Sequence, residues 1–175
     1  MNQQTATAAA TAEPVQYLTF TLDGETFATE ISQVREVLEY SHVTRVPRTP
    51  EFMRGVINLR GNVVPVVDLR LQFGMPAVEP TIDTCIVIVE VAIDDQPTVL
   101  GALADSVQEV IELRDDQQEP APRLGTRIDT DFIQAMGRHD DRFVIILDMD
   151  RVFSVDEIAA VTQLDAGTAP EAAAD

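Results

Sequence analysis

The 175-residue chain contains no lysine and no tryptophan, and it has a single cysteine, Cys85. Without lysine there is neither a phosphate-loop lysine nor a Schiff-base nucleophile. One cysteine cannot form an internal disulfide bond or a zinc cluster, and the apolar neighbours of Cys85 predict a small buried side chain. The lack of tryptophan, with only two tyrosines, argues against a sugar-binding platform.

Long apolar runs are also absent. No segment approaches the ~20 consecutive apolar residues of a membrane-spanning helix. Residues 1–13 contain no basic residue and no apolar core, which argues against a secretory signal. We therefore expect a cytoplasmic protein that does not insert into membranes.

Positive charge is scarce. The chain has 30 acidic and 12 basic residues, and its formal net charge is −18. Nucleic acids and anionic lipids bind cationic surfaces, so neither is an expected partner. The excess of acidic residues is typical of a protein kept in solution by its charge. Alternatively, the negative surface attracts basic partner proteins and speeds their association.

Recognisable catalytic and metal-binding patterns are missing. His42 and His139 lie far apart in polar segments, where surface exposure is a simpler explanation than a metal site. Asp148-Met149-Asp150 begins like a calcium loop, but the glycine and later ligands of such a loop are absent. A carboxylate pair for glycoside hydrolysis stays open in principle. We expect no enzyme activity, no metal and no cofactor.

The body of the chain has the pattern of short β-strands. Leu18, Phe20 and Leu22 alternate with polar residues, and Asp23-Gly24 predicts a hairpin turn. Gly61-Asn62 predicts a type II′ hairpin, while Pro65 predicts an edge strand or a bulge. Further strands are predicted at 34–40, 56–60, 63–69, 85–93, 99–104, 107–113 and 143–149.

Two helices and two tails complete the prediction. Thr130–Met136 is predicted as a short helix, and a capping box at Ser154-Val155-Asp156-Glu157 predicts a final helix over 154–164. Residues 1–14 and 165–175 have few large apolar side chains, so we expect disordered tails. The folded body is therefore expected at 15–164.

An internal repeat organises the strands. Segment 33–40 matches segment 106–113 at an offset of 73 residues, and segment 63–69 matches 143–149 at an offset of 80. The larger offset predicts a longer loop in the second copy, over 115–127. We predict an all-β fold of two packed subdomains, one at about 17–80 and the other at about 84–153. A chance likeness between valine-rich strands is the alternative.

Several motifs resemble the CheW-like domain family. They are Val34-Arg35-Glu36-Val37, Val43-Thr44-Arg45-Val46-Pro47, Gly55-Val56-Ile57-Asn58-Leu59-Arg60-Gly61 and Asp68-Leu69-Arg70. Val107-Gln108-Glu109-Val110 is similar to the second half of the domain, so the resemblance covers nearly the whole folded body. It implies two five-stranded, SH3-like β-barrels with an apolar junction.

The resemblance also implies a function and partners. Members of the family are non-catalytic chemotaxis adaptors that join the regulatory domain of the histidine kinase CheA, itself a CheW-like fold, to the cytoplasmic tips of chemoreceptors. Recruitment to membrane-associated receptor arrays follows. The short segment after Arg151 leaves no place for a receiver domain, so we expect a stand-alone adaptor. An adaptor of surface motility or of another kinase pathway, and a small β-barrel ligand-binding protein, are the alternatives.

Two groups of site residues follow from the same resemblance. The expected kinase- and receptor-coupling surface comprises Val34, Glu36, Asn58, Arg60 and Gly61. The expected receptor-binding groove at the barrel junction comprises Cys85, Ile86, Gly101, Val107 and Val110. From the residues alone, the charged members could be solvated surface groups and the apolar members could be core residues.

Overall fold

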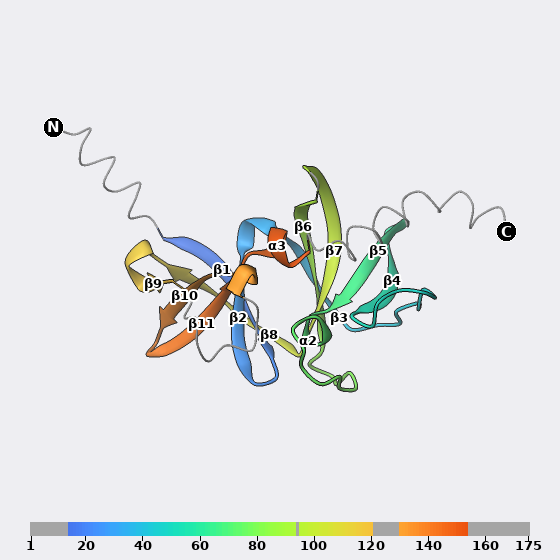
Figure 1. Cartoon of the computed structure of the whole chain (residues 1–175), viewed down its shortest axis with the longest axis horizontal. Helices are drawn as coiled ribbons and strands as arrows, with labels where there is room; N and C mark the ends of the chain where they lie inside the picture. Colours follow the sequence, from blue (N-terminus) through green and yellow to red (C-terminus); the bar gives the residue numbers. More distant parts are fainter. Residues whose placement is uncertain (1–13, 94, 121–129, 154–175) are drawn as a thin grey trace.

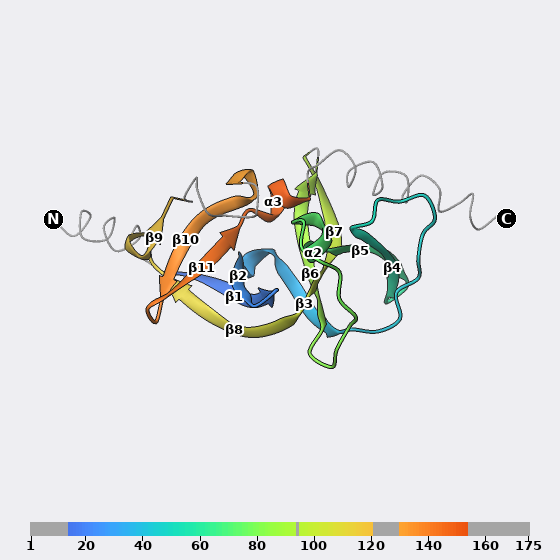
Figure 2. The same cartoon turned by 60° about the horizontal axis from the view of Figure 1, so that its bottom comes forward.

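The computed structural model describes residues 14–93, 95–120 and 130–153. These residues form two β-sheets that lie side by side, with two short helices between them (Figures 1 and 2). The predicted helix at 154–164 and all but one residue of the predicted tails lie outside the described residues. The all-β class is confirmed.

Sheet one has six strands in the order β8-β1-β2-β11-β10-β9. Neighbouring strands are antiparallel, except that β11 runs parallel to β2. The strands are β1 (Val15–Leu22), β2 (Glu25–Glu30), β8 (Ser106–Leu113), β9 (Gln118–Glu119), β10 (Ile133–His139) and β11 (Arg142–Leu147). Two 3-10 turns, η2 (Asp115–Gln117) and η3 (Thr130–Phe132), precede β9 and β10.

Sheet two has five strands in the order β3-β6-β7-β5-β4. Here β5 and β7 form the one parallel pair. The strands are β3 (Val34–Glu39), β4 (Met53–Leu59), β5 (Asn62–Asp68), β6 (Cys85–Ile93) and β7 (Gln96–Ala104). The 3-10 turn η1 (Ile31–Gln33) precedes β3, and the helices α2 (Leu69–Gln72) and α3 (Met149–Val152) follow β5 and β11.

In each sheet, the chain that leaves one edge strand crosses over and pairs with a strand at the opposite edge. In sheet one, the chain leaves edge strand β8 and returns through η2 as β9, which pairs with β10. In sheet two, the chain continues past β3 to Thr44, which forms an isolated antiparallel bridge with Val56 of β4. This arrangement limits exposed strand edges. The SH3-like barrel stays a prediction that these pairings favour.

The internal repeat is visible in equivalent pairings. In sheet one, Ala28 of β2 lies opposite Ile146 of β11, and in sheet two Gly101 of β7 lies opposite Val66 of β5. These pairs are related by the same offsets of 73 and 80 residues found in the sequence. The pairing of β3 with β6 and that of β8 with β1 each contain a bulge, at matching places.

The sheets do not follow the predicted division into 17–80 and 84–153. Sheet one combines the β1–β2 hairpin of the first copy with β8–β11 of the second, and sheet two combines β3–β5 with the β6–β7 hairpin. The two copies therefore exchange hairpins. A repeat identifies equivalent strands, but it cannot reveal which hairpin completes which sheet, because both choices bury the same kinds of side chain.

Two local predictions are wrong, and a third is met only in part. The helix predicted at Thr130–Met136 is wrong, because most of this segment belongs to β10, whose alternating burial suits a strand paired with β11. The type II′ turn is wrong as well, since Arg60 and Gly61 are the two turn residues and both have positive φ, as in type I′. Pro65 lies on β5, which is inside the sheet, although a bulge does interrupt the β4–β5 pairing.

The largest apolar cluster lies between the two sheets and joins them. It includes Phe20 and Phe27 from sheet one, Val89 and Leu100 from sheet two, and Phe153 beside α3. Smaller clusters fill the interior of each sheet. Because burying a large apolar side chain contributes about 1.5–3 kcal/mol, the two sheets cannot separate without exposing much of the core. They therefore hold a fixed relation to each other.

Candidate functional site

The structure brings Glu36 and Arg60 together on sheet two. Both η nitrogens of Arg60 donate to one carboxylate oxygen of Glu36, at 2.8 and 2.6 Å. The Arg60 side chain is 67% exposed and that of Glu36 is 29% exposed. An exposed ion pair of this kind stabilises a fold by only about 0–1 kcal/mol. The pair consequently matters more as a charged surface than as a stabilising contact.

The hairpin that carries Arg60 has a defined shape. Arg60 and Gly61 have φ values of 51° and 88°. The side-chain oxygen of Asn58 accepts a hydrogen bond from the Gly61 amide at 2.8 Å. Asn58 and Gly61 thus hold the turn that presents Arg60. Val34, at the start of β3, is half-buried and packs against the largest core cluster.

Two of the predicted groove residues, Cys85 and Val107, lie at the junction of the sheets and are half-buried. Burial raises the pKa of the Cys85 thiol, and a backbone hydrogen bond from Val107 opposes part of this increase. The thiol therefore stays protonated at neutral pH, which suits a packing residue rather than a nucleophile.

Ile86 and Gly101 are buried inside sheet two rather than displayed at a surface. A Cβ atom added to Gly101 would lie 2.9 Å from the Cγ2 atom of Ile86. These two positions set the internal packing between β6 and β7. Val110 differs, since it lies on β8 of sheet one with 47% of its surface exposed. Of the apolar groove residues, Val110 has the most exposed side chain.

Sequence reasoning missed Val37 as a surface residue. Val37 is 39% exposed on β3 and is the repeat equivalent of Val110. The alignment of the two copies contained the signal, because Glu36-Val37 matches Glu109-Val110. Each copy thus places one exposed valine beside a glutamate on the strand that follows its first hairpin.

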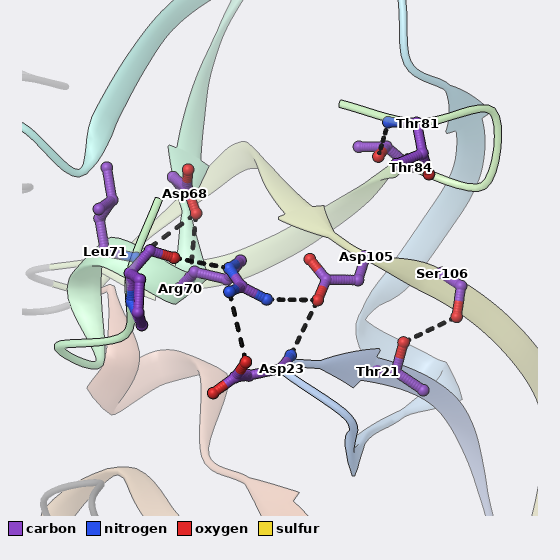
Figure 3. A network of polar contacts seen from close by, with 10 residues as sticks. Thr21, Asp23, Asp68, Arg70, Leu71, Thr81, Thr84, Asp105 and Ser106 are labelled. Atoms are coloured by element: carbon purple, nitrogen blue, oxygen red, sulfur yellow. Dashed lines mark hydrogen bonds and ion pairs between the residues drawn. The ribbon is translucent and has the colours of Figure 1, made fainter. Parts of the chain in front are cut away.

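Arg70 was noted only as part of a motif, yet it forms the main polar contact between the sheets (Figure 3). Its side chain is 8% exposed. One η nitrogen donates to Asp105 at 2.6 Å, and the other lies 3.4 Å from Asp23 in the β1–β2 turn. The Asp23 amide donates to the same Asp105 carboxylate, and the Arg70 Nε atom donates to the Pro76 carbonyl. Arg70 therefore connects α2 with sheet one.

Asp68 begins the same motif and caps α2. Its carboxylate accepts hydrogen bonds from the amides of Arg70 and Leu71, at 3.0 and 3.4 Å. Burial raises the pKa of Asp68, and the two amides and the nearby Arg54 guanidinium oppose the increase. Asp148 caps α3 in the second copy through the amide of Arg151. The repeat thus conserves a strand, a capping aspartate and a short helix.

Within residues 14–93, 95–120 and 130–153, no three His, Cys, Asp or Glu side chains are grouped so as to hold a metal ion. None of the helices in these ranges has the length and apolar character needed to cross a bilayer.

Comparison with known proteins assigns the fold to a family. The model of the family described as the CheW-like domain matches residues 16–157. This chain belongs to the CheW-like domain family. Chemotaxis protein CheW of Klebsiella aerogenes is 33% identical over 146 residues, which cover 83% of this chain and 86% of the relative. Chemotaxis protein CheW of Bacillus subtilis is 32% identical over 136 residues, covering 77% and 84%.

A solved CheW structure agrees with this assignment. The scaffolding protein TtCheW from Thermoanaerobacter tengcongensis superposes with a TM-score of 0.73 and 37% sequence identity. The match covers 82% of this chain and 95% of that protein. The resemblance predicted from the Gly55–Gly61 and Asp68–Arg70 motifs is confirmed.

Proposed function

We propose that this CheW-like protein is a non-catalytic chemotaxis adaptor that couples chemoreceptors to the histidine kinase CheA. The observation that carries the proposal is the similarity, over about four-fifths of the chain, to proteins named chemotaxis protein CheW and to a scaffolding protein of known structure. An adaptor needs surfaces in a fixed relation rather than a reactive group. The apolar cluster shared by the two sheets supplies that rigidity.

The regulatory domain of CheA is the proposed partner of the Glu36–Arg60 surface. Arginine is a favoured anchor at protein interfaces, where its planar guanidinium can form two hydrogen bonds at once. Asn58 and Gly61 fix the hairpin geometry, so little order has to be gained when Arg60 meets a partner. Val34 supports the strand that carries Glu36.

The cytoplasmic tip of a chemoreceptor is the proposed partner at the junction of the sheets. A receptor helix could place an apolar stripe against Cys85, Val107 and Val110, the helix-in-groove mode of recognition. Ile86 and Gly101 would act indirectly, by setting the packing inside sheet two. Binding at this junction would recruit the protein from the cytoplasm to membrane-associated receptor arrays.

Coupling requires only a modest free energy. If receptor and kinase bind the same rigid body, a signal that changes one contact by about 1–3 kcal/mol changes kinase activity several-fold. The adaptor performs no chemistry in this scheme. It transmits the difference in contact energy between two assembled states.

A reconstitution tests the proposal. The immobilised CheA regulatory domain should retain the wild-type protein, and receptor fragments should join the complex and raise kinase activity. Arg60→Gln should lower ternary assembly, because it removes the charge that the β4–β5 hairpin presents. Arg138→Gln is the matched control, since Arg138 forms an exposed pair with Glu119 at 2.6 Å on sheet one.

Two results would contradict the proposal. Retention of neither CheA nor receptor fragments by the folded wild-type protein would exclude this adaptor role. Retention of a CheW-like domain from another kinase, without binding to CheA, would assign the protein to a different pathway.

A further inference from the structure

The loop between β3 and β4 is basic in a strongly acidic chain. Residues 40–52 contain two arginines and one glutamate, whereas the whole chain has a net charge of −18. Arg54 lies 3.6 Å from the carboxylate of Asp68. Arg45 and Arg48 are exposed, and neither pairs with a carboxylate in the described part of the chain. Two neighbouring arginines thus lack a carboxylate partner among the described residues, despite the abundance of acid.

The loop has a defined shape at its base. Thr44 and Val56 exchange two backbone hydrogen bonds, at 2.9 and 2.8 Å. Gly55 has a φ of 145°, and a Cβ atom there would lie 2.0 Å from the Thr44 carbonyl oxygen, so only glycine allows this approach. The Thr49 hydroxyl donates to the Val46 carbonyl at 2.9 Å, closing a turn around Arg48.

The loop is separate from the proposed coupling surface. It enters β4 at Met53, whereas Arg60 follows the opposite end of that strand. Both views show the loop at the end of the molecule away from sheet one (Figures 1 and 2). Pro47, Pro50 and Val46 lie beside the two arginines in an open depression that also includes Glu51. The depression therefore combines two exposed arginines with small apolar side chains and one glutamate.

We propose that Arg45 and Arg48 form a docking surface for a short acidic segment of a partner protein. A guanidinium binds a carboxylate through two parallel hydrogen bonds, and a preformed loop binds with little loss of conformational entropy. The acidic remainder of the surface repels such a segment, which would concentrate its binding at this loop. An anionic bilayer would also face the acidic surface around the loop over a much larger area than a short segment, so the net charge disfavours it as the occupant. The inference does not depend on the proposed chemotaxis function.

Binding of a short fluorescein-labelled Glu-Ala peptide to the full chain, followed by fluorescence anisotropy at low salt, tests the proposal. The wild-type protein should bind this peptide at least fivefold more tightly than its Gln-Ala counterpart. The double variant Arg45→Gln/Arg48→Gln should weaken binding by about fivefold, the effect of two exposed charge pairs. Charge reversal with Arg45→Glu/Arg48→Glu should abolish binding, and added salt should weaken the wild type most.

The matched control is Arg114→Gln/Arg142→Gln, which changes the net charge by the same amount on sheet one. It should change the affinity by less than twofold, and urea unfolding should show that all variants are folded. Equal losses in the two glutamine double variants would overturn the proposal, because net charge alone would then explain binding. Equal binding of both peptides would also overturn it. Vesicles of phosphatidylglycerol that bind through Arg45 and Arg48, while the Glu-Ala peptide does not, would overturn it in favour of a lipid surface.

Discussion

The β4–β5 hairpin of sheet two and the β10–β11 hairpin of sheet one share a backbone but differ in chemistry. Both turns have two consecutive residues with positive φ, Arg60-Gly61 in one and Asp140-Asp141 in the other. Arg60 pairs with Glu36, whereas the equivalent Asp140 lies 3.4 Å from the neighbouring His139. Duplication preserved the scaffold while the two ends acquired different charges. A body with two unlike ends can bind two unlike partners.

The contacts between the sheets show the same divergence. Arg70 on α2 donates to two aspartates, while the equivalent Asp150 on α3 accepts from the Gln33 side chain and the Ala92 amide, at 3.1 and 3.0 Å. Equivalent positions on the two helices thus have opposite charge. The two helices also meet each other, since the Gln72 side chain donates to the carbonyl of its equivalent, Val152.

The largest effect is expected from Arg70→Met. Removing one partner of a buried charged contact costs about 3–5 kcal/mol, and the partial exposure of Asp23 and Asp105 reduces our expectation to ~2–3 kcal/mol. Urea unfolding measures the loss. Asp150→Asn, at the equivalent position, should cost under about 1 kcal/mol because an amide can still accept both hydrogen bonds. Equal losses would break the comparison between the helices.

The next effect is expected from Gly101→Ala. Sheet one has Ala28 at the equivalent position, but the new methyl group in sheet two would meet Ile86 at 2.9 Å and Val66 at 3.3 Å. Overpacking of this kind costs about 1–3 kcal/mol, measurable as a lower thermal midpoint. Ala28→Gly, the reverse exchange, should cost about 1 kcal/mol through backbone entropy. Reduced receptor binding by a fully stable Gly101→Ala would instead indicate a direct contact.

A smaller, pH-dependent effect is expected from Asp68→Asn. Burial raises the pKa of Asp68 in the folded protein above the ordinary value of about 3.9. At a pH below both values, the carboxyl group is neutral in the folded and the unfolded protein, and its contribution to stability is fully present. That contribution is lost as the pH rises through the folded-state pKa. Asparagine keeps the cap but does not titrate, so the variant should gain stability relative to the wild type as the pH rises.

Urea unfolding between about pH 3 and pH 7 would measure this gain. Asp148→Asn, at the more exposed cap of α3, is the matched control for replacing a capping carboxylate. A relative loss of stability for Asp68→Asn with rising pH would mean that Arg54 and the helix amides outweigh burial.

The smallest change in stability is expected from Val110→Asp and Val37→Asp. Both valines are exposed at equivalent positions, so each variant should lie within about 0.5 kcal/mol of the wild type. Only Val110→Asp should weaken retention of receptor fragments, because Val110 belongs to the proposed junction surface. If Val110→Asp unfolds the protein, Val110 is a core residue. If both variants weaken receptor binding equally, the receptor does not distinguish Val110 on sheet one from Val37 on sheet two.

Much of the candidate site follows from the sequence. Glu36 and Arg60 were both predicted as members of the coupling surface, and they lie in contact because β3 and the β4–β5 hairpin belong to one sheet. Ile86 and Gly101 show the limit of such reasoning. An apolar residue on a strand can face the core or a partner, and periodicity does not distinguish these when both faces of the strand are covered. The contact that Arg70 makes between the sheets could not be predicted, because it depends on Asp23, 47 residues earlier in the chain, lying beside α2.

By itself, the sequence determined that this protein is a duplicated all-β body with CheW-like motifs, because alternation, turn residues and spacing are local properties. Tertiary structure alone decided that the copies exchange hairpins, that Thr130–Met136 does not form an α-helix, and which apolar residues are buried. These features depend on pairing with strands from the other copy, and such pairing is a property of the assembled fold rather than of any one segment.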